Sequence, residues 1–501
     1  MHYTLGIDFG GGAAKATLLR EDAQIIATHT VEYPTLHPSA GACEQNPDDW
    51  WNALCACTKN ILSASGISAD GISAVAVDSA THSSVVCGAD MNPLRPCIHW
   101  TDSRSKAQSA TLREKYGDEI FKKTYHRPDT IWTLPQLIWL RENEPETYGK
   151  IRHVLFEKDW LRYRLTGVFC TDRIEAAGSM LYNCDGGDWD DKLCALAGLT
   201  RKNLPPLCEP TDIIGKITEK AESETGLRAG TPVICGTTDT CMEVLASGAV
   251  KKGDMTVKLA TAGRICVITD RAYPDKQLVC YPHASSGLWY PGTATKAAAS
   301  ALRWYRDSFG GSYGDIDSAA AALPVGCDGV MFHPYLNGEL TPYADPALCG
   351  SFIGVRSTHT KAHFDRAVLE GVALSLLDCY RYLAGLSIPH GEAATLIGGG
   401  AKSRLWGQIV SDCLGITLTV TENSDSSFGS AMLAGVAAGM FDGFDDAVKK
   451  CVRTVGTVTP NKENTKLYAA LYEKYRRVHD ALAPIYDGAL SMCCFFLYAR
   501  L

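Results

Sequence analysis

"GIDFGGGAAK", residues 6–15, follows one apolar run and precedes another, ATLL at 16–19. Three consecutive glycines after an acidic strand end fit a phosphate cradle, a dinucleotide-binding loop or a tight turn. A dinucleotide fingerprint needs a third glycine before a helix, whereas this chain has Lys15 and a following strand. The Gly-Lys-Ser/Thr end of a Walker loop is missing as well. A β-hairpin that can cradle phosphates remains, with Asp8 at its mouth.

The segments around this turn predict an α/β or α+β opening. Strand-like runs at 3–8, 14–20 and 24–33 form a meander. A helix is expected at 47–65, where two aspartates suit the first turn, and an apolar strand at 72–79. This order of elements excludes an all-helical fold.

A similar strand–turn–strand pattern recurs at 253–270, which predicts two related halves with a boundary near 245–255. Helices are expected at 294–309 and 364–386. A second glycine triplet follows the apolar run at 395–397 and leads into an amphipathic helix, whose N-terminus favours an anionic ligand. Two glycine turns after apolar strands favour nucleotide binding over plain turns.

Composition limits the function classes. The 501 residues suffice for two to four domains, and the net charge of -8 argues against nucleic-acid partners and anionic membrane surfaces. No secretory signal and no apolar run of about 18 residues is present, so we expect a cytoplasmic protein without a membrane partner. The 20 cysteines lack paired CxxC or Cys/His clusters, which indicates small buried side chains in a reducing compartment rather than a zinc site.

Two carboxylates, Asp8 and Asp239, are candidates for metal binding and acid–base chemistry. Asp8 beside phosphates would be repulsive unless a divalent cation lies between them, so Asp8 is a candidate metal ligand. Asp239 follows an apolar strand and a small-residue turn in VICGTTDT, residues 233–240. It either caps the next helix or acts as a general base toward a substrate hydroxyl.

Several longer stretches carry a family resemblance, among them IHWTDSRS (98–105), EKDWLRYRLTG (157–167), GTTDT (236–240) and LIGGGAKSRLWGQIVSD (396–412). From residue 4 to about 440 the chain resembles the FGGY family of carbohydrate kinases, and within it the xylulokinases. The resemblance implies an α/β fold of two actin-like (ribonuclease H-like) ATPase domains with an interdomain cleft. Residues 1–248 would form the sugar-binding and catalytic domain, 249–485 the nucleotide-binding domain, and 486–501 a tail without an assigned role.

The implied reaction is transfer of the γ-phosphate of ATP to a small sugar, foremost a ketopentose such as xylulose. ATP and Mg²⁺ would be the cofactors; Asp239 would accept the hydroxyl proton, and Asp8 and Asp239 would hold the metal. Alternatives are a kinase of another sugar, a gluconate-like sugar acid or a polyol, and a sugar-binding pseudokinase. A homodimer is left open.

The resemblance also implies contact residues. The substrate would meet five side chains: Thr81, His82, Trp100, Asp102 and Thr240. Arg104 is either a substrate contact or a structural partner of Asp102. The nucleotide would meet three loops, with the residues Gly10, Gly11, Gly12, Lys15, Thr261, Ala262, Gly263, Gly398, Gly399, Gly400, Ala401 and Lys402.

The chain departs from the family at both phosphate loops. Gly11 and Gly12 stand where two hydroxyl residues are usual, and Ala262 replaces a serine. Losing two or three hydrogen bonds of about 0.5–1.5 kcal/mol each predicts nucleotide binding weakened roughly ten- to several-hundred-fold. Thr240 in place of Asn or Gln, and Leu340 in place of Arg, leave the identity of the sugar open.

Overall fold

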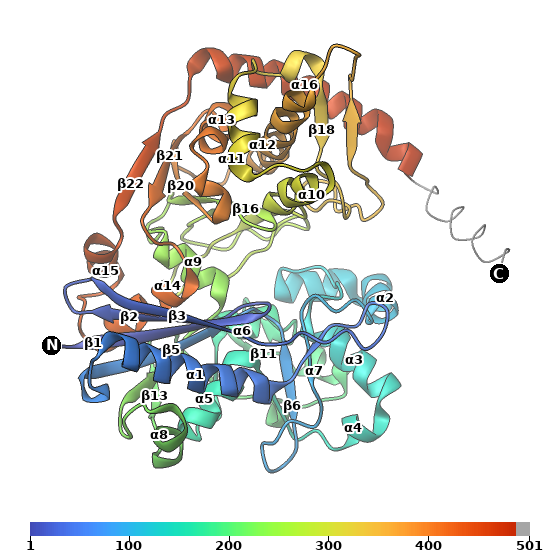
Figure 1. The fold of residues 1–501 in the computed structure, drawn as a ribbon. Coiled ribbons are helices and arrows are strands. Elements are labelled where there is room, and N and C mark those ends of the chain that lie inside the picture. The colour runs from blue at the N-terminus through green and yellow to red at the C-terminus, as the bar shows by residue number, and fades with distance from the viewer. Residues whose placement is uncertain (487–501) are drawn as a thin grey trace. The chain divides into compact units, whose positions relative to one another are not determined.

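The computed structural model describes residues 1–486, which divide into two compact units (Figure 1). Unit 1 comprises Met1–Val250, Cys280–Trp289 and Asn423–Arg453, and unit 2 comprises Lys251–Val279, Tyr290–Glu422 and the described residues from 454 on. The contiguous domains 1–248 and 249–485 remain a prediction. In the compact units, the later segments Cys280–Trp289 and Asn423–Arg453 belong to unit 1. Apart from Tyr486, the predicted tail 486–501 lies outside the described residues.

Unit 1 is built on a six-stranded sheet in the order β13-β14-β5-β1-β2-β3. Its strands are β1 (Tyr3–Phe9), β2 (Ala13–Arg20), β3 (Ile25–Glu32), β5 (Ile72–Ser79), β13 (Ile213–Lys216) and β14 (Pro232–Ile234). β1, β2 and β3 form the predicted antiparallel meander, whereas β5 runs parallel to β1 and β14 parallel to β5.

The two faces of β1 meet different helices. Leu5, Ile7 and Phe9 belong to the apolar core that also contains Trp50 and Leu54 of α1 (Pro47–Ser65). Alternation along the strand sends Thr4, Gly6 and Asp8 to the other face. There the Thr4 hydroxyl donates to the carbonyl of Ala431 in α14 (Ser426–Ala437), so this helix covers the face that carries Asp8.

The remainder of unit 1 consists of short strands and helices around this sheet. The strands are β4 (Glu44–Gln45), β6 (Ser84–Cys87), β7 (Cys97–Ile98), β8 (His153–Phe156), β9 (Thr171–Asp172), β10 (Tyr182–Asn183), β11 (Asp188–Trp189) and β12 (Leu207–Cys208). The helices are α2 (Lys106–Thr124), α3 (Thr133–Asn143), α4 (Pro145–Gly149), α5 (Glu157–Thr166), α6 (Arg173–Gly178), α7 (Asp191–Ala197), α8 (Glu219–Thr225), α9 (Asp239–Ala246) and α15 (Phe444–Cys451).

Unit 2 repeats the pairing pattern of the unit 1 sheet, in the order β17-β16-β15-β20-β21-β22. An antiparallel meander is again followed by two parallel strands and one antiparallel edge strand. The two related halves expected from the sequence therefore share one topology. The strands are β15 (Met255–Leu259), β16 (Gly263–Val267), β17 (Gly292–Thr295), β20 (Ala393–Ile397), β21 (Thr417–Thr421) and β22 (Thr454–Val458).

Helices and one small hairpin complete unit 2. They are α10 (Ala299–Phe309), α11 (Tyr313–Ala321), α12 (Lys361–Gly385), α13 (Arg404–Leu414), α16 (Lys462–Tyr486), β18 (Met331–His333) and β19 (Ser351–Ile353). The predicted helix 294–309 was wrong over its first residues, because residues 292–295 pair with β16 as an edge strand. Tertiary pairing overrides the helix propensity of the alanines there.

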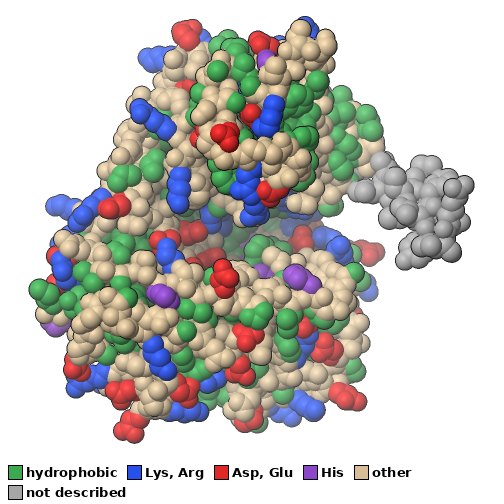
Figure 2. Space-filling view, in the orientation of Figure 1, with side chains coloured by type: hydrophobic (Ala, Val, Ile, Leu, Met, Phe, Trp, Pro, Cys, Tyr) green, Lys and Arg blue, Asp and Glu red, His purple; other side chains and the backbone are tan. Residues whose placement is uncertain are grey.

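The visible surface carries charges of both signs. Figure 2 shows Lys and Arg side chains interspersed with Asp and Glu on each unit. Among residues 1–486, no helix is long and apolar enough to cross a membrane.

The close approach of Gly6 to α14 generates a stability prediction. A Cβ at Gly6 would lie 2.1 Å from the carbonyl oxygen of Ser427 and 2.3 Å from the amide nitrogen of Ala431. We expect Gly6→Ala to destabilise unit 1 by about 1–3 kcal/mol, because backbone must move to admit the methyl group. Thermal unfolding followed by circular dichroism measures the effect. Gly117→Ala is the control: its Cβ meets nothing within 4 Å, so it should leave the midpoint unchanged or raise it.

Candidate functional site

Strand register brings three aspartates to one edge of the unit 1 sheet. Asp8 pairs with Asp78 across the parallel strands β1 and β5, and Ser79 pairs with Thr238 just before α9. Since parallel strands place their carboxyl ends at one edge, Asp8, Asp78 and Asp239 meet there. Asp78 was not predicted from the sequence, although its place at the end of the apolar run ISAVAV matches that of Asp8 after YTLGI.

The electrostatics of these aspartates are those of crowded carboxylates. Burial raises the pKa of the Asp8 carboxyl to about 7, although hydrogen bonds with Asp78 and Ser426 oppose the shift, and the charge of Asp239 adds to it. Burial and the charge of Asp8 raise the pKa of Asp78 well above its usual range, despite the hydrogen bond that Ser430 donates to it. Crowded carboxylate oxygens are the donor set that Mg²⁺ takes in proteins, so the residues fit such an ion.

Asp239 occupies the first position of α9. The N-cap of that helix is Thr238, whose hydroxyl accepts from the amide of Cys241. The capping role considered for Asp239 thus belongs to its neighbour. The turn before it is tight: Gly236 has φ 65°, and a Cβ there would lie 2.3 Å from the carbonyl oxygen of Val77. Asp239 is partly exposed, as a group that meets a substrate must be.

A buried acid lies close to this edge. Glu157, the first residue of α5, is fully buried. Burial raises its pKa well above the usual range, and the charges of Asp8, Glu175 and Asp239 add to the shift. The protonated form of Glu157 is therefore favoured. It stands in the stretch EKDWLRYRLTG, but no pattern in the sequence distinguished it from an ordinary first-turn acid.

His82 is held rigidly in the turn that follows β5. Its backbone has φ 76°, its amide donates to Glu175 at 3.0 Å, and its Nε2 lies 2.8 Å from the hydroxyl of Tyr281. The imidazole also lies 4.6 Å from the Trp132 ring, centroid to centroid, with the two ring planes tilted by 55°. A Cβ at Gly178 would lie 2.2 Å from the imidazole, so only glycine fits there. Tyr281 comes from the segment 280–289 that returns to unit 1, which the sequence did not predict.

The other predicted substrate residues divide into exposed and structural groups. Thr81 and Thr240 are partly exposed beside His82 and Asp239, and Trp100 is 39% exposed. Asp102 is buried and accepts hydrogen bonds from the amide of Cys43 and from Arg104. Of the two roles considered for Arg104, the structure contains the ion pair with Asp102, at 2.9 Å.

The first glycine turn is open around its middle residues. A Cβ at Gly11 or Gly12 would meet nothing within 4 Å, and Gly10 donates its amide to the carbonyl of Ala13. Lys15, one of the predicted nucleotide residues, forms an ion pair with Asp425 at 3.1 Å while staying partly exposed. The turn therefore has free space at the two positions where the family carries hydroxyls.

The remaining predicted nucleotide residues lie together in unit 2. Lys258 of β15 pairs with Ile397 of β20, so the turns that follow these two strands are neighbours. Gly398 has φ 89°, and a Cβ there would lie 2.6 Å from the carbonyl oxygen of Leu259. Thr261, Ala262, Gly399 and Lys402 are exposed, Gly398 and Ala401 are partly exposed, and Gly263 and Gly400 are buried.

Two protein-family models match most of the chain. Models described as the N-terminal and C-terminal domains of the FGGY family of carbohydrate kinases match residues 3–246 and 259–438. The chain is 30% identical to a xylulose kinase of Bacillus subtilis, covering 96% of this chain and 97% of that protein. It is also 30% identical to the gluconokinase of the same organism, covering 94% of each.

Solved structures give the same result. The xylulose kinase from Rhodospirillum rubrum superposes with a TM-score of 0.90 at 28% identity, covering 97% of this chain and 100% of that chain. The gluconate kinase from Lactobacillus acidophilus superposes with a TM-score of 0.91 at 25% identity, covering 97% and 99%. The fold is therefore the two-domain, actin-like α/β fold of the sugar kinases.

Glu175 provides a pH prediction, because burial raises its pKa to about 8 while the Lys158 ammonium opposes the shift. A carboxyl with a raised folded pKa stabilises the fold fully below its unfolded value of 4.5, and that contribution is lost as the pH rises toward about 8. Glu175→Gln keeps the acceptor for the His82 amide and removes the titration. Between pH 5 and pH 8 we expect the unfolding free energy of the variant to rise relative to that of wild type by at least about 1 kcal/mol. The measurement is the difference in melting temperature between the two proteins at each pH.

Glu114→Gln, on the exposed side of α2, is the control for this experiment. If the difference in melting temperature between Glu175→Gln and wild type stays constant from pH 5 to pH 8, the raised pKa assigned to Glu175 is contradicted.

Proposed function

The chain belongs to the FGGY family of carbohydrate kinases and is a phosphotransferase, and we propose that it transfers the γ-phosphate of ATP to a hydroxyl of a ketopentose such as xylulose. The observation that carries the proposal is the register that sets Asp239 beside Asp8 and Asp78. Phosphoryl transfer requires positioning and charge neutralisation more than unusual reactivity, and this sheet edge offers a base and a cation-binding acid cluster.

In the proposed mechanism Asp239 accepts the proton of the attacking hydroxyl. The tight turn before Asp239 fixes its position at the start of α9. Its partial exposure leaves the carboxylate accessible to a substrate. Asp8, with Asp78 behind it and Asp239 beside it, would hold Mg²⁺, which supplies positive charge to the transferring phosphoryl group.

We propose that His82 orients the acceptor sugar. Its imidazole is fixed between Tyr281 and Trp132, so it can offer one directed polar contact without losing side-chain entropy on binding. Thr81, Trp100 and Thr240 are exposed enough to contribute contacts, whereas Asp102 would act through the position of its neighbours. A gluconate-like sugar acid is the second candidate acceptor, since a gluconokinase reaches the same 30% identity to the chain as a xylulose kinase does.

On the nucleotide side we propose that backbone amides supply most contacts. Residues 10–12 and 261–263 carry no serine and only one threonine, so donors from N–H groups replace the hydroxyls usual in the family. Lys15 would approach the phosphates while paired with Asp425. Residues 398–402, an adjoining turn in unit 2, would contact the adenosine.

The decisive experiment is an ADP-release screen over D-xylulose, other ketoses, polyols and D-gluconate with wild type and Asp239→Asn. The proposal expects turnover with a ketopentose and a loss in kcat of roughly 10²–10⁴-fold in the variant, because the general base is lost without a change of shape. Asp191→Asn, which changes the first residue of α7 instead, should keep full activity. Sugar binding without turnover by wild type, or full activity of Asp239→Asn, would refute the proposal.

The open space at the first glycine turn gives a gain-of-affinity prediction. We expect the double variant Gly11→Thr, Gly12→Ser to lower the KM for ATP about 30-fold, since two hydroxyl donors at about 1 kcal/mol each are restored where a Cβ would meet no atom within 4 Å. The KM for the sugar serves as the internal control and should not change. An unchanged or higher KM for ATP would show that these positions do not face the nucleotide.

A further inference from the structure

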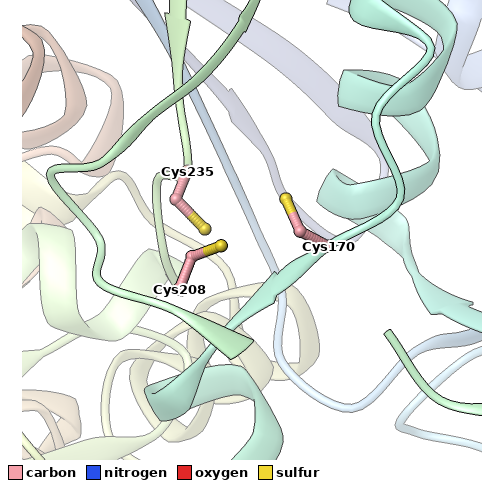
Figure 3. A group of neighbouring side chains, drawn as sticks. All are labelled: Cys170, Cys208 and Cys235. Carbon is pink, nitrogen blue, oxygen red and sulfur yellow. The ribbon is translucent and has the colours of Figure 1, made fainter. Parts of the chain in front are cut away.

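Three cysteines from separate segments of unit 1 converge on one point (Figure 3). Cys170 precedes β9, Cys208 ends β12 and Cys235 follows β14. Their sulfur atoms all lie within 4.8 Å of one another, and Figure 3 shows the three side chains directed toward a common centre. From the sequence, these residues were interpreted as dispersed small buried side chains, because they are far apart in the chain.

The cluster is held in place by its surroundings. β9 and β12 run parallel, with Cys208 opposite Asp172. Asp172 in turn accepts a hydrogen bond of 2.8 Å from the hydroxyl of Thr237 and pairs with Lys158 at 2.8 Å. The segments that carry the three sulfurs are therefore tied together through side chains that are themselves fully buried.

A buried guanidinium stabilises negative charge on these sulfurs. Arg162 is 1% exposed, and its Nη1 donates to the sulfur of Cys170 at 3.4 Å and to that of Cys235 at 3.2 Å. Together with hydrogen bonds from the thiols of Cys208 and Cys235, Arg162 holds the pKa of Cys170 well below its usual range. The pKa values of Cys208 and Cys235 are raised.

We propose that Cys170, Cys208 and Cys235 form a three-thiolate site for one Zn²⁺ ion. Zinc–sulfur bonds of about 2.3 Å require sulfur atoms about 3.8–4.0 Å apart, so sulfurs within 4.8 Å need only small side-chain shifts. Cys208 is partly exposed, which gives the ion a route from solvent and leaves a side where water can complete four ligands. Arg162 supplies the hydrogen bonds that commonly support metal-bound ligands.

The charge of the filled site favours a divalent ion. Binding breaks the S–H bond of each thiol that becomes a ligand, releases those protons to solvent and forms three metal–sulfur bonds. Zn²⁺ with three thiolates carries one negative charge, which the neighbouring Arg162 guanidinium offsets. Cu⁺ with three thiolates would carry two negative charges beside a single guanidinium, at an added cost of burying charge. The proposal therefore commits to Zn²⁺, for which Cd²⁺ is the spectroscopic probe.

The ion would brace the segment that leads to the active site. Cys235 lies in the same turn as Gly236 and Thr237, immediately before α9 and Asp239, and Cys170 lies two residues before Asp172. One zinc would join β9, β12 and the segment after β14. The expected consequence is stabilisation of unit 1, since the ion binds the folded site and not the unfolded chain.

The test uses the full chain, made metal-free under a phosphine reductant that does not bind zinc. Cd²⁺ titration should give a thiolate-to-metal charge-transfer band that saturates at one Cd²⁺ per chain, and a weakly buffered solution should show proton release on binding. Zn²⁺ should raise the melting temperature. Cys208→Ser, at the partly exposed position, should weaken binding at least tenfold while its metal-free melting temperature stays near that of wild type.

A control variant separates this site from the other thiols. Cys55→Ser changes another partly exposed cysteine of unit 1 and should bind like wild type. Cys170→Ser is the second test variant and should also lose the charge-transfer band. The proposal is overturned if wild type shows no stoichiometric band, or if Cys208→Ser and Cys170→Ser both bind Cd²⁺ as tightly as wild type.

Discussion

The parallel alignment of β1, β5 and β14 is the constraint on which the functional part of this molecule depends. A parallel register can bring side chains from distant positions of the chain to one edge, and here it does so for Asp8, Asp78 and Asp239. α14 packs closely against the same face of β1, and Gly6 permits this approach because it has no side chain. From that position Ser430 of α14 donates a hydrogen bond to Asp78, so the packed helix helps to hold one of the three carboxylates.

Crowding these carboxylates is unfavourable in the metal-free protein. Burial and mutual repulsion raise the pKa values of Asp8 and Asp78, so the site favours either protons or a cation. The same repulsion suits a kinase, because a cation that relieves it also offsets the charge of a transferring phosphoryl group. Burial likewise raises the pKa values of the neighbouring Glu157 and Glu175, which favours their protonated forms.

The sequence predicted the fold where local patterns were strong and missed features that depend on tertiary pairing. The meander, α1, β5 and the second strand–turn–strand unit follow directly from apolar periodicity and turn residues. The last two residues of the strand at 292–295 were taken for helix, because only the pairing with β16 distinguishes this strand. Likewise Asp8 and Asp239 were recognisable by motif, whereas Tyr281 reaches His82 only because a segment from beyond residue 250 returns to unit 1. The sulfur cluster was invisible for the same reason.

The central claim is that register, not sequence motif alone, builds one cation site from Asp8, Asp78 and Asp239. The most direct measurement is Mn²⁺ binding followed by electron paramagnetic resonance, with ADP present, in wild type and Asp78→Asn. The account predicts one bound Mn²⁺ in wild type and at least a tenfold weaker affinity in Asp78→Asn, with the melting temperature of the variant equal to or above that of wild type. Equal Mn²⁺ affinity in the two proteins would contradict it.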